Sequence, residues 1–364
     1  DRVARLCQAI SRVNLGEGLA LRILFQGRLL EEEEVLANIP GFMEDPSAQV
    51  VLLPWPSLAI CSEWCPASLW NSRTGACSKK LPSLPTFAHS CACSRDASLA
   101  IVGRAGGAVE VWDVEVGEPV LSLKGPHNAQ AALAVALSAD GALAAAGFVN
   151  GTAWVWSLRR GAKEQALLRH AGPVQAVAFS PDGRRGITGS TDETSKVWSL
   201  DTGLCLATLA PHGGLVLAAL LLPDGERALT ACFDGAVRLS SVDGGQCLRV
   251  LREATALDVP VLSMALSGDG AWLLTGSFDG SARVWDVRSG QCARTLDGHR
   301  EQIKTVALAA DAQLALTGSV DGSARLWDLK TGVCLRSLHV AAAMPATDGA
   351  ERSCDRILCV AIVE

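Results

Sequence analysis

A repeat of about 42 residues occupies most of this chain, and no other sequence feature restricts the fold as strongly. Three copies read TGSTDETSKVWSLDTGLCLATL, TGSFDGSARVWDVRSGQCARTL and TGSVDGSARLWDLKTGVCLRSL. When the copies are aligned, an anchor residue recurs at steps of 42, 44, 42, 42, 45 and 42, at Trp70, Trp112, Trp156, Trp198, Ser240, Trp285 and Trp327. Such self-similarity predicts an array of one supersecondary unit.

Each copy alternates apolar and polar residues between turn residues, which is typical of four short strands. One copy shows them in order as VAFSPDG, RRGITGS, the run into Trp198, and LCLATL. A four-stranded sheet cannot bury both faces alone, so the copies must stack, and radial stacking gives a propeller. We therefore expect an all-β fold with seven blades over residues 54–340, the first blade being degenerate because Trp64 and Pro66 stand at its turn positions.

Residues 341–364 do not form a complete further copy. An alanine-rich linker precedes SCDRILCVAIVE, which has the pattern of one strand. Two arrangements fit this tail: the start of a truncated eighth blade, or a strand that pairs with the first blade and closes the ring.

The copies resemble the WD-repeat β-propeller family, whose repeat carries Gly-His near its start and Trp-Asp near its end. Gly298-His299 and Trp327-Asp328 match both signatures, and the resemblance covers roughly residues 50–340. It implies a buried hydrogen-bonded network of His, Thr, Asp and Trp in each blade. Because the set recurs from copy to copy, we interpret it as structural rather than catalytic. The residues at its positions are His170, Thr188, Asp192, Trp198, His212, Thr230, Asp234, Thr275, Asp279, Trp285, His299, Thr317, Asp321 and Trp327.

Several copies depart from this pattern. Ser240 replaces the tryptophan in one copy, Ala146 and Asn150 replace Thr and Asp in another, and Leu257 stands where a third would have His. Val102 also stands at a Thr position. We expect the blades with these departures to depend more on apolar packing than on polar networks.

The resemblance also implies that partners contact one face of the propeller. Two positions per blade carry this role in the family: the residue just before the turn Asp, and one early in the first strand. Two phenylalanines among them predict an apolar patch of the kind that marks a binding site. The residues are Val149, Thr191, Phe233, Phe278 and Val320, with Leu133, Gln175, Leu217, Leu262 and Lys304.

Residues 1–53 lie outside the repeat. Their pattern predicts a helix from about Arg2 to Asn14, a strand and tight turn over residues 21–30, and a closing strand at 49–53. This order resembles a truncated, small α+β ubiquitin-like (β-grasp) domain; an unrelated helix plus hairpin is the alternative. The resemblance implies a docking surface at Leu24, Gln26, Gly27 and Arg28. No Gly-Gly tail follows Leu53, so the segment would serve as a fixed dock.

Other ligand classes are not expected. With 32 Lys and Arg against 38 Asp and Glu, and no dense basic tract, the chain lacks the charge pattern of a nucleic-acid binder. Its longest apolar run, residues 215–222, is too short to span a membrane. No acid pair, nucleophile motif or metal set stands outside the repeat register, so we expect no enzyme activity, cofactor or metal. Five of the thirteen cysteines recur one per copy, and the close pairs Cys61/Cys65 and Cys91/Cys93 complete no zinc set; reduced thiols favour an intracellular location, in the cytoplasm or alternatively the nucleus.

These observations predict a non-catalytic scaffold or adaptor. The propeller face would bind a client protein or peptide, and the ubiquitin-like segment would dock a second partner, with the ubiquitin–proteasome pathway as one setting. Two alternatives remain open: a regulatory or sensor propeller within a larger signalling protein, and a propeller enzyme.

Overall fold

The structure is a computed structural model that describes residues 21–25, 28–30, 50–54, 57–62, 68–72, 77–80, 88–94, 98–114, 116, 118–125, 131–160, 163–167, 169–209, 212–251, 259–339 and 356–363. Within these ranges the regular structure is almost entirely β-strand, apart from a short 3₁₀ helix, η2 (Leu158–Arg160). The described residues include no helix that is long and apolar enough to cross a membrane.

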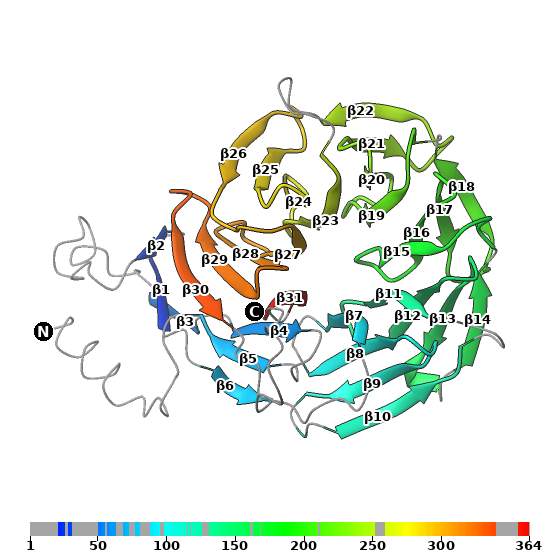
Figure 1. The fold of residues 1–364 in the computed structure, drawn as a ribbon, viewed down its shortest axis with the longest axis horizontal. Helices are drawn as coiled ribbons and strands as arrows, with labels where there is room; N and C mark the ends of the chain where they lie inside the picture. Colours follow the sequence, from blue (N-terminus) through cyan, green and yellow to red (C-terminus); the bar gives the residue numbers. More distant parts are fainter. Residues whose placement is uncertain are drawn as a thin grey trace, which may run out of the picture.

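Six four-stranded antiparallel sheets follow one another along the chain and are arranged radially (Figure 1). In each sheet the four strands pair in chain order, the first lying innermost and the fourth outermost. The strands are β7 (Ala88–Cys93), β8 (Leu99–Arg104), β9 (Val109–Asp113) and β10 (Glu118–Leu123); β11 (Ala132–Leu137), β12 (Leu143–Phe148), β13 (Ala153–Ser157) and β14 (Lys163–Leu167); β15 (Val174–Phe179), β16 (Arg185–Ser190), β17 (Ser195–Ser199) and β18 (Cys205–Leu209); β19 (Val216–Leu221), β20 (Arg227–Cys232), β21 (Val237–Ser241) and β22 (Cys247–Leu251); β23 (Val261–Leu266), β24 (Trp272–Ser277), β25 (Ala282–Asp286) and β26 (Cys292–Leu296); β27 (Ile303–Leu308), β28 (Leu314–Ser319), β29 (Ser323–Asp328) and β30 (Cys334–His339).

The expectation of seven blades, each built from one repeat copy, is wrong: six blades consist of four consecutive strands. The copy anchored on Trp70 supplies only β4 (Ser57–Ser62), β5 (Ser68–Asn71) and β6 (Cys77–Lys80). These strands form a composite sheet with β31 (Ile357–Val363), in the order β31-β4-β5-β6. The physical reason lies just upstream, because β3 (Val50–Pro54) pairs with β1 (Leu21–Phe25) and leaves the inner edge of β4 to another strand.

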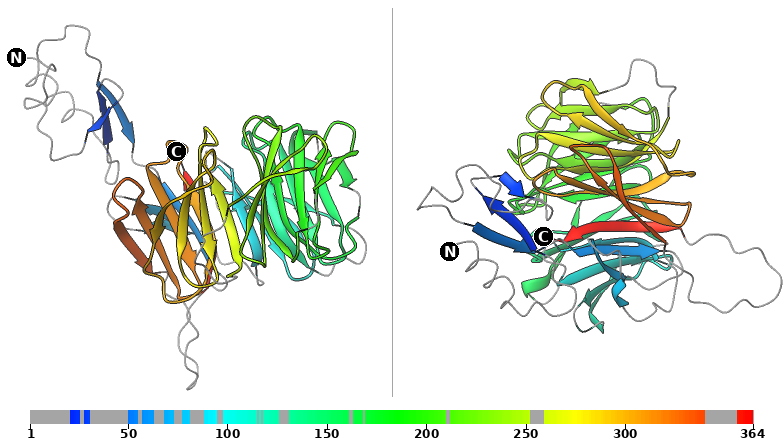
Figure 2. Two further views of the ribbon diagram at one scale, coloured as in Figure 1. Left: turned by 90° about the horizontal axis from the view of Figure 1, so that it is seen from above. Right: turned by 90° about the vertical axis from the view of Figure 1, so that its left-hand side faces the viewer.

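The C-terminal strand closes the ring of innermost strands. β31 pairs antiparallel with β4, from Ile357 opposite Ser62 to Val363 opposite Ser57. It also lies against β27 and β7, and its Val360 N–H donates to Thr305 Oγ1 at 3.2 Å. Figure 2 shows β31 alongside β4 when the sheets are seen edge-on. Of the two arrangements that fit the tail, the structure therefore has the ring-closing one.

Neighbouring sheets pack closely at a glycine near the end of the second strand in five of the six sheets, whereas β20 has Ala231 at this position. A Cβ added to Gly147 would lie 2.5 Å from Val174 Cγ1 of the next sheet, and one added to Gly189 would lie 2.7 Å from Val216 Cγ1. The second strands are otherwise almost wholly buried, whereas the outermost strands are largely exposed. The core therefore lies between the sheets, as separate apolar layers repeated around the ring.

The N-terminal segment contains a three-stranded antiparallel sheet in the order β2-β1-β3, with β2 spanning Arg28–Leu30. Its register places Ile23 opposite Leu30 and Leu52. Of the four residues expected to form a ubiquitin-like dock, Leu24 lies in β1 and Arg28 in β2, while Gln26 and Gly27 lie outside the described residues. The predicted helix at residues 2–14 also lies outside them.

Candidate protein-binding surface

A β-bulge occurs at the same place in every innermost strand. The pairing register shifts between the first and third residues of each, so the second residue is the extra one. A bulge takes its extra residue out of the ladder and re-aims its side chain. Five of these residues are those that the sequence assigned to the first strand: Leu133, Gln175, Leu217, Leu262 and Lys304. All five side chains keep solvent-exposed surface.

The second set of predicted residues lies beside the bulges. In each of five sheets, the residue before the turn aspartate or its substitute donates its N–H to the carbonyl two residues before the bulge residue. The donors are Val149 (3.1 Å to Ala131), Thr191 (3.0 Å to Pro173), Phe233 (2.9 Å to Leu215), Phe278 (2.9 Å to Pro260) and Val320 (3.1 Å to Gln302). The ten residues therefore form five adjacent pairs at one end of the propeller, and we call this surface the bulge face.

The bulge face is most apolar over two neighbouring sheets. Phe233 is 53% exposed and Phe278 is 54% exposed, although phenylalanine is among the residues most often buried. They belong to the β19–β22 and β23–β26 sheets, whose bulge residues Leu217 and Leu262 are half-buried. Leu215, beside the same turn, is 37% exposed. Val149, Thr191 and Val320 are half-buried, so the aromatic part of the surface is confined to these two sheets.

Each of the two phenylalanines is followed in the chain by an aspartate that pairs with an arginine. The Arg238 guanidinium donates two hydrogen bonds to the Asp234 carboxylate, and Arg283 Nη2 donates to Asp279 Oδ2 at 3.2 Å. Burial alone would raise the pKa of Asp279, but hydrogen bonds from Ser281 and the charge of Arg283 lower it. The apolar sector therefore has a polar rim in which each carboxylate is neutralised, an arrangement common at protein interfaces.

The next sheet along the ring carries a cation at its bulge. Lys304 is exposed, yet partial desolvation lowers the pKa of its ammonium, and the nearby charge of Arg356 lowers it further. Arg356 precedes β31, the innermost strand beside β27. The bulge face thus passes from two aromatic positions to a basic position across three consecutive sheets.

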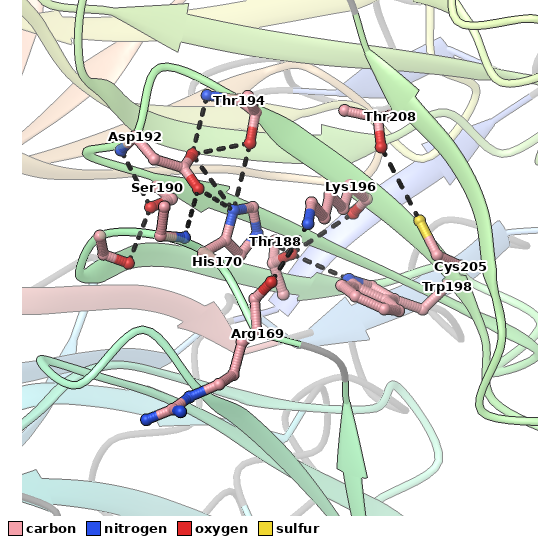
Figure 3. A network of polar contacts seen from close by, with 12 residues as sticks. Arg169, His170, Thr188, Ser190, Asp192, Thr194, Lys196, Trp198, Cys205 and Thr208 are labelled. Atoms are coloured by element: carbon pink, nitrogen blue, oxygen red, sulfur yellow. Dashed lines mark hydrogen bonds and ion pairs between the residues drawn. The ribbon is translucent and has the colours of Figure 1, made fainter.

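A complete polar network lies inside the β15–β18 sheet (Figure 3). Trp198 Nε1 donates to Thr188 Oγ1 at 2.9 Å, and Thr188 Oγ1 lies 2.8 Å from His170 Nε2. His170 Nδ1 lies 3.0 Å from Asp192 Oδ2. Burial lowers the pKa of His170 more than Asp192 raises it, so the imidazole is neutral and these contacts assign its proton to Nδ1. The result is one directed chain from indole to hydroxyl to imidazole to carboxylate.

The carboxylate at the end of this chain is strongly acidic. Burial would raise the pKa of Asp192, but Thr194, the Ala171 N–H and His170 together lower it to about 2. The β27–β30 sheet repeats the arrangement with Trp327 to Thr317 at 2.9 Å, Thr317 to His299 at 2.8 Å and His299 to Asp321 at 3.0 Å. These networks tie the buried tryptophan, threonine and histidine to the turn aspartates of the bulge face, which are half-buried.

Two further sheets do not complete the network. In the β23–β26 sheet, Trp285 Nε1 donates to Thr275 Oγ1 at 3.0 Å, while residue 257, where the histidine would stand, lies outside the described residues. In the β19–β22 sheet the expected network of His212, Thr230 and Asp234 does not form. Neither nitrogen of His212 nor Thr230 Oγ1 has a hydrogen-bond partner, and Arg238 binds the Asp234 carboxylate instead.

Sequence reasoning missed two bulge residues. His89 is the extra residue of β7 and is exposed. It lies 23 residues before Trp112, the same spacing as Leu133 before Trp156, so the repeat register contained the signal. Leu358 is the extra residue of β31. No anchor tryptophan follows it in the chain, so the register could not identify it.

The described residues offer little metal or thiol chemistry. They contain no group of three or more His, Cys, Asp or Glu residues placed to hold a metal ion. Cys205, Cys247, Cys292 and Cys334 lie one per sheet at the start of outermost strands, and each thiol donates to the backbone carbonyl two residues later. Burial raises the pKa of the Cys232 thiol to about 12, which keeps it protonated.

Comparison with known families identifies part of the repeat. Residues 162–199, 245–286 and 290–328 match the family WD40, described as WD domain, G-beta repeat. These three segments are WD40 repeats. Each contains the outermost strand of one sheet and the first three strands of the next, so the family repeat is offset from the blade by one strand. The three include the copies whose tryptophan donates to threonine: Trp198, Trp285 and Trp327. No curated protein matches the chain.

Proposed function

We propose that the protein is a non-catalytic interaction scaffold whose bulge face binds a client protein or peptide. WD40 propellers generally mediate protein–protein interaction. The observation that carries the proposal is the pair of half-exposed phenylalanines, Phe233 and Phe278, at equivalent positions of adjacent sheets. Aromatic side chains in a rim of satisfied polar groups are typical anchors of an interface.

The order of residues along the bulge face suggests what the client contains. Phe233 with Leu217 and Phe278 with Leu262 suit two apolar side chains. Lys304 on the following sheet suits an acidic group one step further along. A client segment with two bulky apolar residues followed by a carboxylate would contact all three sheets.

A second dock on the N-terminal segment belongs to the same proposal. Leu24, Gln26, Gly27 and Arg28 would form its contact surface, by resemblance to ubiquitin-like domains. The antiparallel β2-β1-β3 sheet, in which Phe25 pairs with Arg28, supports such a segment. Its partner would be a component of the ubiquitin–proteasome pathway, which would make the protein a two-ended adaptor.

A regulatory propeller of a larger signalling protein is the alternative, and it predicts that the bulge face binds another part of the same polypeptide. A propeller enzyme is less well supported, because the buried His–Thr–Asp sets are closed by their own hydrogen bonds.

The decisive experiment selects peptides from a display library on the purified full chain. We expect enrichment of sequences with two bulky apolar residues near an acidic one. Phe233→Ala/Phe278→Ala should abolish this enrichment, whereas Leu248→Ala/Val250→Ala should not. The control pair is 54% and 49% exposed and lies on β22, on the outer edge of the propeller. Equal enrichment by all three proteins would refute the assignment of the bulge face.

The second dock requires its own measurement. Affinity capture from cell extract compares the wild type, the phenylalanine double variant and a deletion of residues 1–53. Loss of clients with the double variant, and of proteasome or ubiquitin-pathway proteins with the deletion, is the expected result. Identical partners for the wild type and the deletion would eliminate the N-terminal dock while leaving the propeller proposal standing.

A further inference from the structure

The β19–β22 sheet lacks the indole that completes the other networks. In three sheets the anchor tryptophan donates its Nε1–H to a buried threonine, at 2.9 Å for Trp198, 3.0 Å for Trp285 and 2.9 Å for Trp327. Here the anchor is Ser240, which is only 1% exposed. A small side chain therefore stands at a buried position that elsewhere holds the largest one.

The polar atoms that would face this indole are present and unpaired. Thr230 Oγ1, the counterpart of the acceptor Thr188, has no hydrogen-bond partner, and Thr230 is 0% exposed. His212 is 1% exposed, and neither of its ring nitrogens has a partner. Buried polar groups without partners are rare in proteins and call for an explanation.

The charged groups around His212 do not supply its missing contacts. Arg238 engages the Asp234 carboxylate that would otherwise face the imidazole. Desolvation, with the charge of Arg238, lowers the pKa of His212 to about 4 against a smaller opposing effect of Asp234. The imidazole is therefore neutral near pH 7, and offers one N–H donor and one nitrogen acceptor.

Within the β19–β22 sheet the apolar side chains do not compensate for the lost ring, whereas Ile187 of the neighbouring sheet is larger than its counterpart Ala145. In the β15–β18 sheet, Trp198 packs with Val177, Phe179 and Leu200. The residues at the same register positions, 42 later, are all smaller: Ala219, Leu221 and Val242. They belong to an apolar cluster completed by Ala176, Ile187, Val197, Leu209 and Ala228, and none of these is aromatic.

We propose that this position binds a small planar heteroaromatic molecule of the indole class, whose N–H donates to Thr230 Oγ1 while its ring occupies the place of the anchor tryptophan. His212 would line the polar edge of the ligand, and the cluster around Leu221 would cover its faces. Buried apolar sites left by the loss of a large side chain are known to admit ring-sized ligands. The site is distinct from the bulge face, so it does not depend on the proposed function.

The test measures the melting temperature and calorimetric binding of the full chain with indole and with 1-methylindole, which has no N–H. We expect a saturable rise in melting temperature with indole. Thr230→Val keeps the shape but removes the acceptor, and should weaken indole binding about fivefold, the value of one net hydrogen bond, without changing the binding of 1-methylindole. Ser240→Trp should abolish binding because its own indole fills the position. If that variant does not fold, Ser240→Leu serves the same purpose.

Phe233→Ala/Phe278→Ala controls for adsorption to the exposed aromatic surface and should leave the indole response unchanged. The proposal is overturned if indole produces no saturable shift up to its solubility limit, or if Ser240→Trp responds like the wild type. It is also overturned if Thr230→Val binds both compounds as the wild type does. A response lost only in the phenylalanine variant would place the ligand on the bulge face and reject this site.

Discussion

Thr188 is the junction of the β15–β18 network, and replacing it with valine should destabilise the protein strongly. Its hydroxyl accepts from Trp198 Nε1 at 2.9 Å and donates to His170 Nε2 at 2.8 Å. Valine has nearly the same shape, so Thr188→Val leaves packing intact while it leaves two buried groups without partners. Each such group costs about 1–3 kcal/mol, so we expect a loss of about 2–6 kcal/mol in the free energy of unfolding.

The β19–β22 sheet supplies a matched control at the same register position. Thr230 is equally buried, but its hydroxyl has no hydrogen-bond partner. Thr230→Val therefore removes a buried polar atom and breaks no hydrogen bond. We expect a change within about 1 kcal/mol of zero, toward higher stability, because removing an unsatisfied buried group relieves its desolvation cost.

Urea unfolding of both variants and the wild type, followed by tryptophan fluorescence, provides the comparison. The midpoints can be compared directly when the slopes of the transitions agree, since an altered slope indicates a change in the surface exposed on unfolding or a departure from two-state unfolding. A large drop for Thr188→Val beside a small change for Thr230→Val supports the network argument. Equal losses at the two positions would refute it, because burial of the side chain alone would then explain both.

Three further outcomes are expected. Ala146→Thr should stabilise the protein by about 1 kcal/mol more than Ala146→Val in urea unfolding, because Trp156 Nε1 is buried without a partner and only threonine offers an acceptor; equal effects would contradict this. Because the pKa of His212 is lowered to about 4, its contribution to the free energy of unfolding should be complete above pH 6.5. This free energy should decline by about 3 kcal/mol as the pH falls to 4. His212→Gln should flatten that part of the stability–pH profile. An unchanged profile would show that protonation of His212 does not cause the loss of stability. Deleting residues 353–364 should cost at least about 3 kcal/mol, since it removes buried Ile357 and Val360 from the ring; an unchanged urea midpoint would show that β31 contributes nothing.

Repeat spacing made much of the propeller predictable, because each tryptophan fixed the register of its four strands. The register also placed Phe233 and Phe278 at the ends of second strands, beside the bulges that carry Leu217 and Leu262. What the pattern could not indicate is the pairing partner of each edge strand. β3 is a continuous apolar run that could serve either the N-terminal segment or a blade, and the competition between pairing with β1 and pairing with β4 is invisible in a local pattern.

The failed network of the β19–β22 sheet shows a second limit. His212, Thr230 and Asp234 all stand at the correct spacing, so the motif appears complete except for Ser240. Without the indole donor, and with Arg238 attached to Asp234, none of the expected contacts among the three forms. Spacing therefore identifies which residues share a position, but the hydrogen bonds depend on every member being present.

The distribution of networks around the ring is itself informative about function. In the sheets with complete networks, Asp192 and Asp321 accept from a buried histidine and from the next backbone N–H, at 2.8 Å from Ala171 and 3.1 Å from Arg300. In the two sheets that expose a phenylalanine, the equivalent carboxylates are engaged by Arg238 and Arg283 on the third strand.

In those two sheets the turn carboxylate is therefore paired with an arginine beside the phenylalanine rather than with a buried histidine. Proteins commonly violate a local structural rule at functional sites and compensate elsewhere. The β11–β14 sheet also lacks a complete network, since Trp156 Nε1 has no partner, so an incomplete network alone does not mark this sector. What distinguishes the sector is an arginine paired with the turn carboxylate beside each exposed phenylalanine, which is the pattern expected if it is maintained for binding. The flanking sheets, with their closed His–Thr–Asp chains, would then provide the rigid frame that holds the sector in place.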